Sequence, residues 1–182
     1  SRGLGDVYKR QIKDYTFYGC SSLAAIVLPS NLTSIGKYAF YDCYELAEIN
    51  IPSSVSSIGE FAFTNTNWFH YNTDSEFIVG DGILLKVTPV SQNIALSSSI
   101  RSIVGGAFES AGIEQITLPA SVTVIPDYAF SGCTNLSEVI FRGTITSVGS
   151  RAFNGCTKLE SVSIPSGAAV ADDAYVNSGL DQ

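Results

Sequence analysis

The chain has 182 residues and a formal net charge of −7, and 45% of its residues are hydrophobic while only 15% are charged. This composition supplies enough apolar side chains for a core and excludes a disordered polypeptide. Lysine and arginine do not cluster beyond the first ten residues, and no apolar run approaches the ~18 residues of a membrane span, so we expect neither nucleic-acid binding nor membrane insertion.

The beginning of the chain differs from the rest. Residues 1–11, SRGLGDVYKRQ, have neither a period nor an amphipathic pattern. This string resembles the translation of a transposase adapter used to build sequencing libraries, and we exclude it from the fold prediction. We expect a single repeat array over residues 12–182 that is incomplete at both ends, because Ile12 aligns with the middle of the later repeats.

Seven-residue phrases that close on a phenylalanine recur along the chain. They read SIGKYAF at 34–40, SIGEFAF at 57–63, SIVGGAF at 102–108, VIPDYAF at 124–130 and SVGSRAF at 147–153. The successive phenylalanines are 23, 45, 22 and 23 residues apart. Such a fixed period is the signature of a solenoid, in which repeats that cannot bury their apolar faces alone stack into one core.

Each repeat combines a strand signal with a turn signal. In ELAEINIP at 45–52, Ile49 and Ile51 alternate with polar residues, which places both on one face of a strand. In IGKYAFYDC at 35–43, apolar residues three and four apart indicate a short helical or 3₁₀ turn. We therefore predict a β-rich solenoid of about seven repeats of 22–23 residues, with parallel strands paired between successive repeats.

Equivalent residues lie above one another in such a stack, so we expect one aromatic spine. Its members are Phe17, Phe40, Phe63, Phe108, Phe130 and Phe153. The long interval before Phe108 contains EFIVGDGILLKV at 76–87, where the glycines between two apolar runs indicate a hairpin. Ile94 and Leu96 then return to the phase of Ile49 and Ile51, which indicates one longer repeat rather than a domain boundary.

These motifs resemble the BspA-like (Treponema-type) leucine-rich repeat family. LTSIGKYAFYDCYELAEINIP at 32–52 and FSGCTNLSEVIFRGTITSVGSRAFNGC at 130–156 are close to its consensus, and the likeness continues from Ile12 to the end of the chain. The resemblance implies a leucine-rich-repeat-like right-handed superhelix. It also implies a secreted or surface-attached bacterial protein involved in adhesion and host-protein binding, although these residues contain no signal sequence.

Four cysteines share one position of the repeat: Cys20, Cys43, Cys133 and Cys156. The same position elsewhere holds Thr66, Ala111 and Ser178. A position that accepts these side chains is typical of small-residue packing, which is the interpretation we favour. Disulfides within the pairs Cys20/Cys43 and Cys133/Cys156, or a metal site, are the alternatives.

His70 is the only histidine, and it lies in NWFHYN at 67–72. One histidine without a paired cysteine or carboxylate pattern favours neither a zinc site nor a catalytic triad, so we expect no metal, no cofactor and no enzyme activity. We interpret Trp68, His70 and Tyr71 as the rim of a loop that leads to the hairpin. An aromatic ligand-contact patch is the alternative.

The outward side of the predicted strands is the candidate ligand face. Its residues are Val27, Glu48, Asn50, Gln115, Thr117, Glu138, Ile140, Ser161 and Ser163. Repeat proteins use such extended surfaces for binding, whereas the alternative is a merely solvated face. We therefore predict a non-catalytic binding module of a secreted or cell-surface bacterial protein, with host or microbial surface proteins or glycans as partners. A structural spacer that displays another domain is the alternative function.

Overall fold

A computed structural model describes residues 10–89 and 91–181, so most of the adapter-like string at 1–11 lies outside the described residues. The chain forms two compact units. The first contains the residues up to Thr73 together with Val79–Ile83, and the second contains Asp74–Ile78 together with the residues from Leu84 onward. Each unit is a β-solenoid, and the long repeat predicted from the sequence is where the chain passes from one unit to the other.

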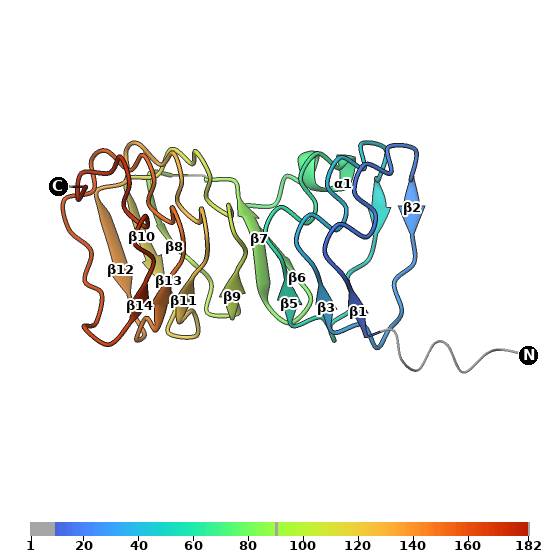
Figure 1. The fold of residues 1–182 in the computed structure, drawn as a ribbon, viewed down its shortest axis with the longest axis horizontal. Helices are drawn as coiled ribbons and strands as arrows, with labels where there is room; N and C mark the ends of the chain where they lie inside the picture. Colours follow the sequence, from blue (N-terminus) through green and yellow to red (C-terminus); the bar gives the residue numbers. More distant parts are fainter. Residues whose placement is uncertain (1–9, 90, 182) are drawn as a thin grey trace, which may run out of the picture. The chain divides into compact units, whose positions relative to one another are not determined.

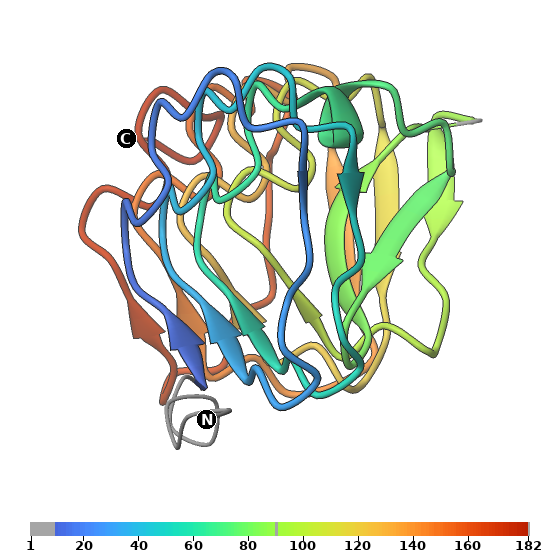
Figure 2. The ribbon, with the colours of Figure 1, turned by 90° about the vertical axis from the view of Figure 1, so that its right-hand side faces the viewer.

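Two parallel sheets build the first unit. The first sheet has the order β1-β3-β5, and its strands are β1 (Gln11–Ile12), β3 (Ser34–Ile35) and β5 (Ser57–Ile58). The second sheet pairs β2 (Ala25–Ile26) with β4 (Glu48–Ile49). Figure 2 shows β1, β3 and β5 side by side. Because Ile35 is the register partner of both Ile12 and Ile58, like residues lie above like residues, as the period predicts.

The second unit repeats this plan, with longer strands in one of its two sheets (Figure 1). One sheet has the order β12-β10-β8, from β8 (Asn93–Ala95), β10 (Gln115–Leu118) and β12 (Glu138–Phe141). The other has the order β11-β13-β14, from β11 (Val124–Ile125), β13 (Ser147–Val148) and β14 (Ala169–Val170). All these pairings are parallel, which confirms the predicted parallel solenoid.

The hairpin predicted over residues 76–87 is also present. It consists of β6 (Glu76–Val79) and β7 (Ile83–Val87), and β7 is also a neighbour of β9 (Ser102–Ile103). Gly80 and Gly82 form the connection with φ values of 56° and 70°, a left-handed conformation that glycine adopts at little cost. The chemistry of this turn, rather than a ligand, therefore accounts for the GDG sequence.

The segment between the two strands of a repeat is tighter than a helix. In the second repeat, the Tyr41 N–H donates to the Tyr38 carbonyl at 3.2 Å and the Cys43 N–H donates to the Phe40 carbonyl at 3.2 Å. Tyr38 and Asp42 have φ values of 54° and 60°. These left-handed residues interrupt right-handed helical geometry, so the predicted helical turn is a pair of successive turns. Among the described residues, the one helix is α1 (Asn67–His70).

Stacked aromatic rings fill the core of each unit. In the first unit the ring centroids of Phe17 and Phe40 are 5.0 Å apart, and those of Phe40 and Phe63 are 5.3 Å apart. In the second unit the stack contains Phe108, Phe130, Phe153 and Tyr175, with separations of 4.7, 5.3 and 5.4 Å. The predicted spine is thus confirmed within each unit, and Tyr175 is a further member that was not predicted.

The glycine of the SIG phrases is explained by close contact between coils. A Cβ atom on Gly36 would lie 2.4 Å from the Asp14 nitrogen, and one on Gly59 would lie 2.4 Å from the Lys37 nitrogen. Real side chains do not approach a neighbouring backbone so closely. Glycine at this position therefore allows the strands β1, β3 and β5 to stack, and it sets the spacing of the coils that carry the ligand face.

Candidate functional site

The strands β2 and β4 present the predicted ligand face of the first unit. Their register pairs Ala25 with Glu48 and Ile26 with Ile49. Leu28 and Ile51 are buried, while Glu48 and Asn50 are exposed. Val27 is 96% exposed, which is unusual for a β-branched apolar residue and draws attention to this surface. The alternation predicted from the sequence therefore holds here, with the apolar residues turned inward and the candidate ligand residues turned outward.

This face is hollowed. A depression of about 600 Å³ lies over the two strands. It is lined by Ala25, Ile26, Val27, Leu28, Ser30, Ala47, Glu48, Ile49, Asn50, Pro52 and Trp68. Most of the lining residues are apolar, Asn50 and Ser30 are polar, and Glu48 is the single charged residue of the lining. Such a lining suits a ligand group that buries apolar surface and offers hydrogen-bond donors at its edge.

Trp68 joins the depression because α1 replaces strand structure in the third repeat. The Thr66 hydroxyl caps this helix by accepting a hydrogen bond from the Phe69 N–H at 3.1 Å. The backbone N–H of Trp68 donates to the Leu46 carbonyl at 2.7 Å. The Trp68 ring packs edge-on against Phe63 with a centroid separation of 4.9 Å. The indole is therefore a half-buried wall with a fixed position rather than a loose surface ring.

The other two residues of the predicted aromatic patch lie apart from the depression. His70 and Tyr71 are exposed and contact each other edge-to-face at 4.8 Å, but neither lines the depression. Trp68 thus belongs with Val27, Glu48 and Asn50, which the sequence analysis had assigned to a different group. A short helix shifts the direction of successive side chains by about 100° per residue, which separates Trp68 from His70.

In the second unit the ligand face is carried by β8, β10 and β12. The register pairs Gln115 with Glu138 and Thr117 with Ile140. The Gln115 amide donates a hydrogen bond to the Glu138 carboxylate, and Ile140 is 38% exposed. The alternation is again confirmed, since Ile116, Leu118 and Val139 are buried.

The same face contains two residues that the sequence analysis did not name. Asn93 is the register partner of Gln115, and Ala95 is the partner of Thr117. The signal was available, because Ile94 and Leu96 were already in phase with the inward residues of earlier strands. A second depression of about 240 Å³ adjoins these residues, between β8 and the stem of the hairpin, and Glu76 and Pro89 help to line it.

The strand predicted around Ser161 and Ser163 is not formed. Both serines are exposed and Val162 and Ile164 are half-buried, so the alternation persists without a ladder. The Ile164 N–H donates to the Val162 carbonyl at 3.1 Å. This local bond closes a tight turn and removes a donor that a strand pairing with β12 would need.

The thiols occupy packing positions in three of the four repeats concerned. Cys43, Cys133 and Cys156 are buried, and their Sγ atoms donate to the carbonyls of Phe17, Phe108 and Phe130 at 3.0, 2.9 and 3.1 Å. Burial raises the pKa of Cys133 and Cys156 to about 12. Cys20, by contrast, is exposed, so the packing interpretation is wrong for this residue. All four thiols are free.

A further group of surface residues escaped the sequence analysis. Tyr15, Tyr38 and Phe61 form one file of rings on the turns of the first unit, and Tyr18 and Tyr41 form a second. The recurrence of tyrosine at 15 and 38, and at 18 and 41, is visible in the sequence. It was missed because these residues fall between the strand and spine positions that the repeat pattern emphasises.

Within residues 10–89 and 91–181, His, Cys, Asp and Glu side chains do not gather in groups of three or more that could hold a metal ion. The helical structure of this same part of the chain is neither long nor apolar enough to cross a membrane.

Comparison with known proteins places these repeats in a family. The model of the BspA type leucine rich repeat region matches the chain in 6 copies over residues 10–83 and 86–181. No curated protein matches the sequence. This family match confirms the resemblance noted from the motifs.

Several solved structures are similar. The Treponema pallidum leucine rich repeat protein is 28% identical, with 82% of this chain and 71% of that chain covered and a TM-score of 0.43. A leucine rich cell surface protein of Faecalibacterium prausnitzii is 25% identical, with coverages of 90% and 54% and a TM-score of 0.56, so this chain spans about half its length. The pneumococcal vaccine antigen PcpA is 17% identical, with coverages of 93% and 60% and a TM-score of 0.44.

The recurring SIG phrases, the paired parallel strands of each unit and the family match over nearly all described residues agree with one another. The chain therefore belongs to the BspA-type leucine-rich repeat family.

Proposed function

We propose that this chain is a non-catalytic binding module of a bacterial cell-surface protein, and that it contacts surface proteins or glycans of a host or of other microbes through its strand face. The observation that carries this proposal is the depression over β2 and β4, where Val27 is 96% exposed beside a fixed tryptophan. Apolar and aromatic residues that remain accessible at the centre of a surface are those that contribute most to binding energy.

Two further observations support the proposal. The buried thiols of Cys133 and Cys156 stay protonated at physiological pH, because their pKa lies near 12, and this argues against a nucleophilic role. The similar Faecalibacterium prausnitzii structure is described as a cell surface protein, which supports the same location for this chain.

The test is a binding panel of purified extracellular-matrix proteins and glycans at physiological salt, read by biolayer interferometry. Val27→Glu places a charge in the depression without touching the core. Val124→Glu is the matched control, because Val124 is an exposed valine (47%) on β11, outside the strand face. We expect Val27→Glu to weaken the affinity for any partner that the chain binds by about tenfold or more, as for an interface hot spot. We expect Val124→Glu to leave this affinity unchanged.

A spacer role is the second candidate function, and the continuous coil-to-coil hydrogen bonding within each unit favours it. If no member of the panel is retained, or if the two glutamate variants behave alike, the binding role through this face is contradicted and the spacer role is favoured.

A further inference from the structure

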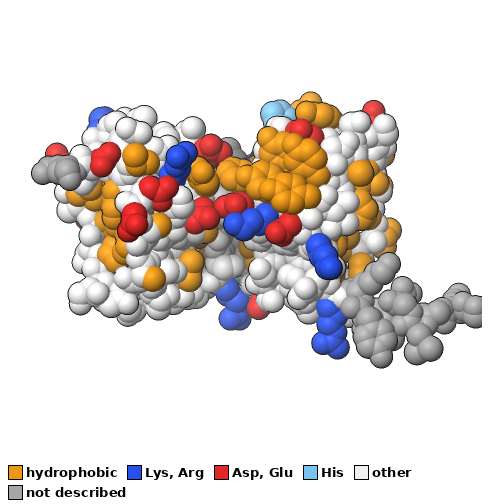
Figure 3. Space-filling model, viewed as in Figure 1, with side chains coloured by type: hydrophobic (Ala, Val, Ile, Leu, Met, Phe, Trp, Pro, Cys, Tyr) orange, Lys and Arg blue, Asp and Glu red, His pale blue; other side chains and the backbone are white. Residues whose placement is uncertain are grey.

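The turns of the first unit carry a compact aromatic surface, which we call the tyrosine surface. It consists of Tyr15, Tyr18, Tyr38, Tyr41, Tyr44 and Phe61. Tyr15 stacks on Tyr38 with a centroid separation of 5.1 Å and an interplanar angle of 5°, and Tyr18 stacks on Tyr41 at 5.3 Å and 4°. The two files contact each other through the tilted pair Tyr38 and Tyr41 at 5.4 Å. Figure 3 shows hydrophobic side chains gathered on the visible face of the first unit, bordered by charged ones.

The backbone does not require aromatic residues here. Tyr15, Tyr38 and Phe61 have φ values of 59°, 54° and 54°, a left-handed conformation that bulky residues adopt at a cost and that glycine or asparagine adopts readily. The equivalent position of a later repeat is in fact a glycine, Gly106, with φ of 77°. The backbone conformation alone therefore does not account for large rings at these positions.

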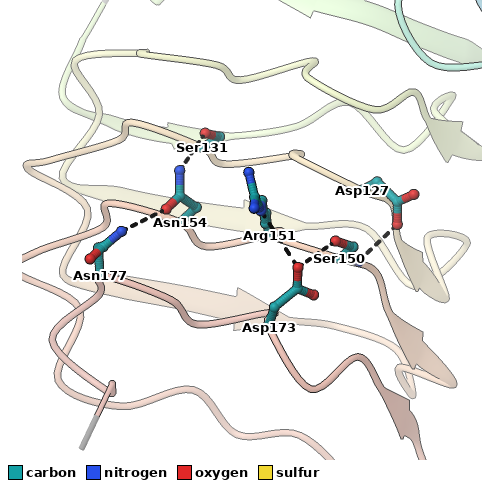
Figure 4. A network of polar contacts seen from close by, with 7 residues as sticks. All are labelled: Asp127, Ser131, Ser150, Arg151, Asn154, Asp173 and Asn177. Atoms are coloured by element: carbon teal, nitrogen blue, oxygen red, sulfur yellow. Dashed lines mark hydrogen bonds and ion pairs between the residues drawn. The ribbon is translucent and has the colours of Figure 1, made fainter.

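The second unit shows that the fold does not require them either. The same turn position there holds Tyr128, Arg151 and Asp173 in successive repeats. Arg151 and Asp173 form an ion pair with an Nε–Oδ2 distance of 3.5 Å, and the Ser150 hydroxyl donates to Asp173 at 2.8 Å (Figure 4). Equivalent turns of the second unit therefore stack as well with polar groups, as Arg151 and Asp173 do.

The tyrosine surface remains open to solvent and is set among carboxylates. Tyr15, Tyr18 and Tyr44 are 57%, 49% and 53% exposed. The Tyr44 hydroxyl hydrogen-bonds to the Asp42 carboxylate, which raises the pKa of Tyr44. Residues 11–73 of the first unit contain the carboxylates Asp14, Asp42, Glu45, Glu48 and Glu60 against the lysines Lys13 and Lys37. Lys37 pairs with Glu60 at 2.9 Å, and carboxylates remain in excess.

We infer that the tyrosine surface binds a positively charged, arginine-containing segment of a partner protein. A guanidinium group combines the two interactions that this surface offers, since it stacks on aromatic rings and donates hydrogen bonds to a carboxylate. The Asp42 carboxylate, which also accepts a hydrogen bond from the Asn65 amide at 2.8 Å, is such an acceptor. Charge complementarity adds attraction between an acidic chain and a basic segment.

Two other occupants fit less well. A neutral sugar ring can stack on the rings, but it carries no positive charge to pair with the carboxylates beside them. A second copy of the chain would bring together two surfaces that both carry carboxylates, and like charges oppose such pairing. The basic segment is the occupant that the rings and the carboxylates favour together.

The experiment titrates the full chain with a fluorescently labelled arginine-rich peptide, an oligolysine peptide of equal charge and a glutamate-rich peptide, and reads fluorescence anisotropy. Tyr38→Asn removes a ring at a position where asparagine suits the backbone, and Tyr128→Asn makes the same change in the second unit, where φ is 57°. We expect Tyr38→Asn to weaken the affinity for the arginine-rich peptide by about tenfold, and Tyr128→Asn to change this affinity by less than about twofold. We also expect the oligolysine peptide to bind more weakly than the arginine-rich peptide, and the glutamate-rich peptide not to bind.

A second variant pair keeps the test decisive if Tyr38→Asn fails to fold. Asp42→Asn retains the rings and a residue type suited to the left-handed backbone, whereas Asp172→Asn neutralises an exposed carboxylate of the second unit. We expect Asp42→Asn, and not Asp172→Asn, to weaken the affinity for the arginine-rich peptide. Equal losses for Asp42→Asn and Asp172→Asn would show attraction to net charge alone, and equal losses for Tyr38→Asn and Tyr128→Asn would show that the rings of the first unit have no special role. Either result would overturn the inference. So would binding of the glutamate-rich peptide, or of a neutral chitin oligosaccharide that Tyr38→Asn abolishes, or a dimer that the same variant dissociates.

Discussion

The clearest stability prediction concerns Phe130, the middle ring of the aromatic stack in the second unit. Its side chain is fully buried, and it lies between Phe108 and Phe153 at centroid separations of 4.7 and 5.3 Å. Replacing a buried phenylalanine by alanine costs about 3–5 kcal/mol through lost burial and the cavity left behind. Each lost ring pair adds about 0.5–1.5 kcal/mol beyond burial. The measured cost of such substitutions already includes the lost ring contacts, so we expect Phe130→Ala, which loses two ring pairs, to lower the free energy of unfolding by roughly 4–5 kcal/mol, at the upper end of the range for buried phenylalanines.

Phe17→Ala is the matched comparison, because Phe17 occupies the same repeat position but is only half-buried and stacks on Phe40. We expect it to cost roughly 2 kcal/mol less than Phe130→Ala, since less apolar area and one ring pair fewer are lost. Urea denaturation followed by circular dichroism measures both values. Equal losses for the two variants, or a loss below roughly 1.5 kcal/mol for Phe130→Ala, would refute the assignment of these rings to a stacked core.

Three further predictions follow from contacts and burial. Gly59→Ala should destabilise the chain by about 1–3 kcal/mol through overpacking, while Gly167→Ala, where nothing lies within 4 Å of the added Cβ, should be close to neutral in the same urea assay. At pH 8 a thiol reagent such as 5,5′-dithiobis(2-nitrobenzoate) should label Cys20 quickly in the native chain and Cys133 and Cys156 only in urea; fast native labelling of all of them would contradict their burial. Because folding raises the pKa of Cys133 and Cys156 from about 9 to about 12, their buried protonated form contributes stability below pH 9 that is lost as the pH rises toward 12. The urea midpoint of unfolding should therefore fall less steeply with rising pH when Cys133 and Cys156 are both replaced by alanine. An unchanged slope between pH 9 and pH 12 would argue against this linkage.

The repeat period and the alternation of apolar residues predicted much of the fold. Phe40, Phe130 and their equivalents were identified because burial imposes the same residue type on every coil. The strands β4, β10 and β12 were recognised for the same reason, since each has one buried face. The short strands of the SIG phrases were not predicted, because two residues are too few to show a period of two.

The turns and the ligand site were less accessible to sequence reasoning. A left-handed backbone at Tyr38 has no signal in a residue type that rarely adopts it, so a helical turn was the reasonable expectation. Trp68 joined the strand face because a short helix displaces the third repeat, which depends on tertiary packing against Leu46 and Phe63 rather than on local propensity. Hydrogen bonding within residues 162–164 likewise replaced the strand that alternation predicted around Ser161 and Ser163.

The binding role through the strand face is tested most directly by hydrogen exchange of the full chain with and without a protein retained from the panel. We predict slower amide exchange in residues 25–28 and 48–50 and at Trp68 when the partner is bound, with no change at β11. A partner that leaves these amides unaffected while protecting β11 or β13 would contradict the account.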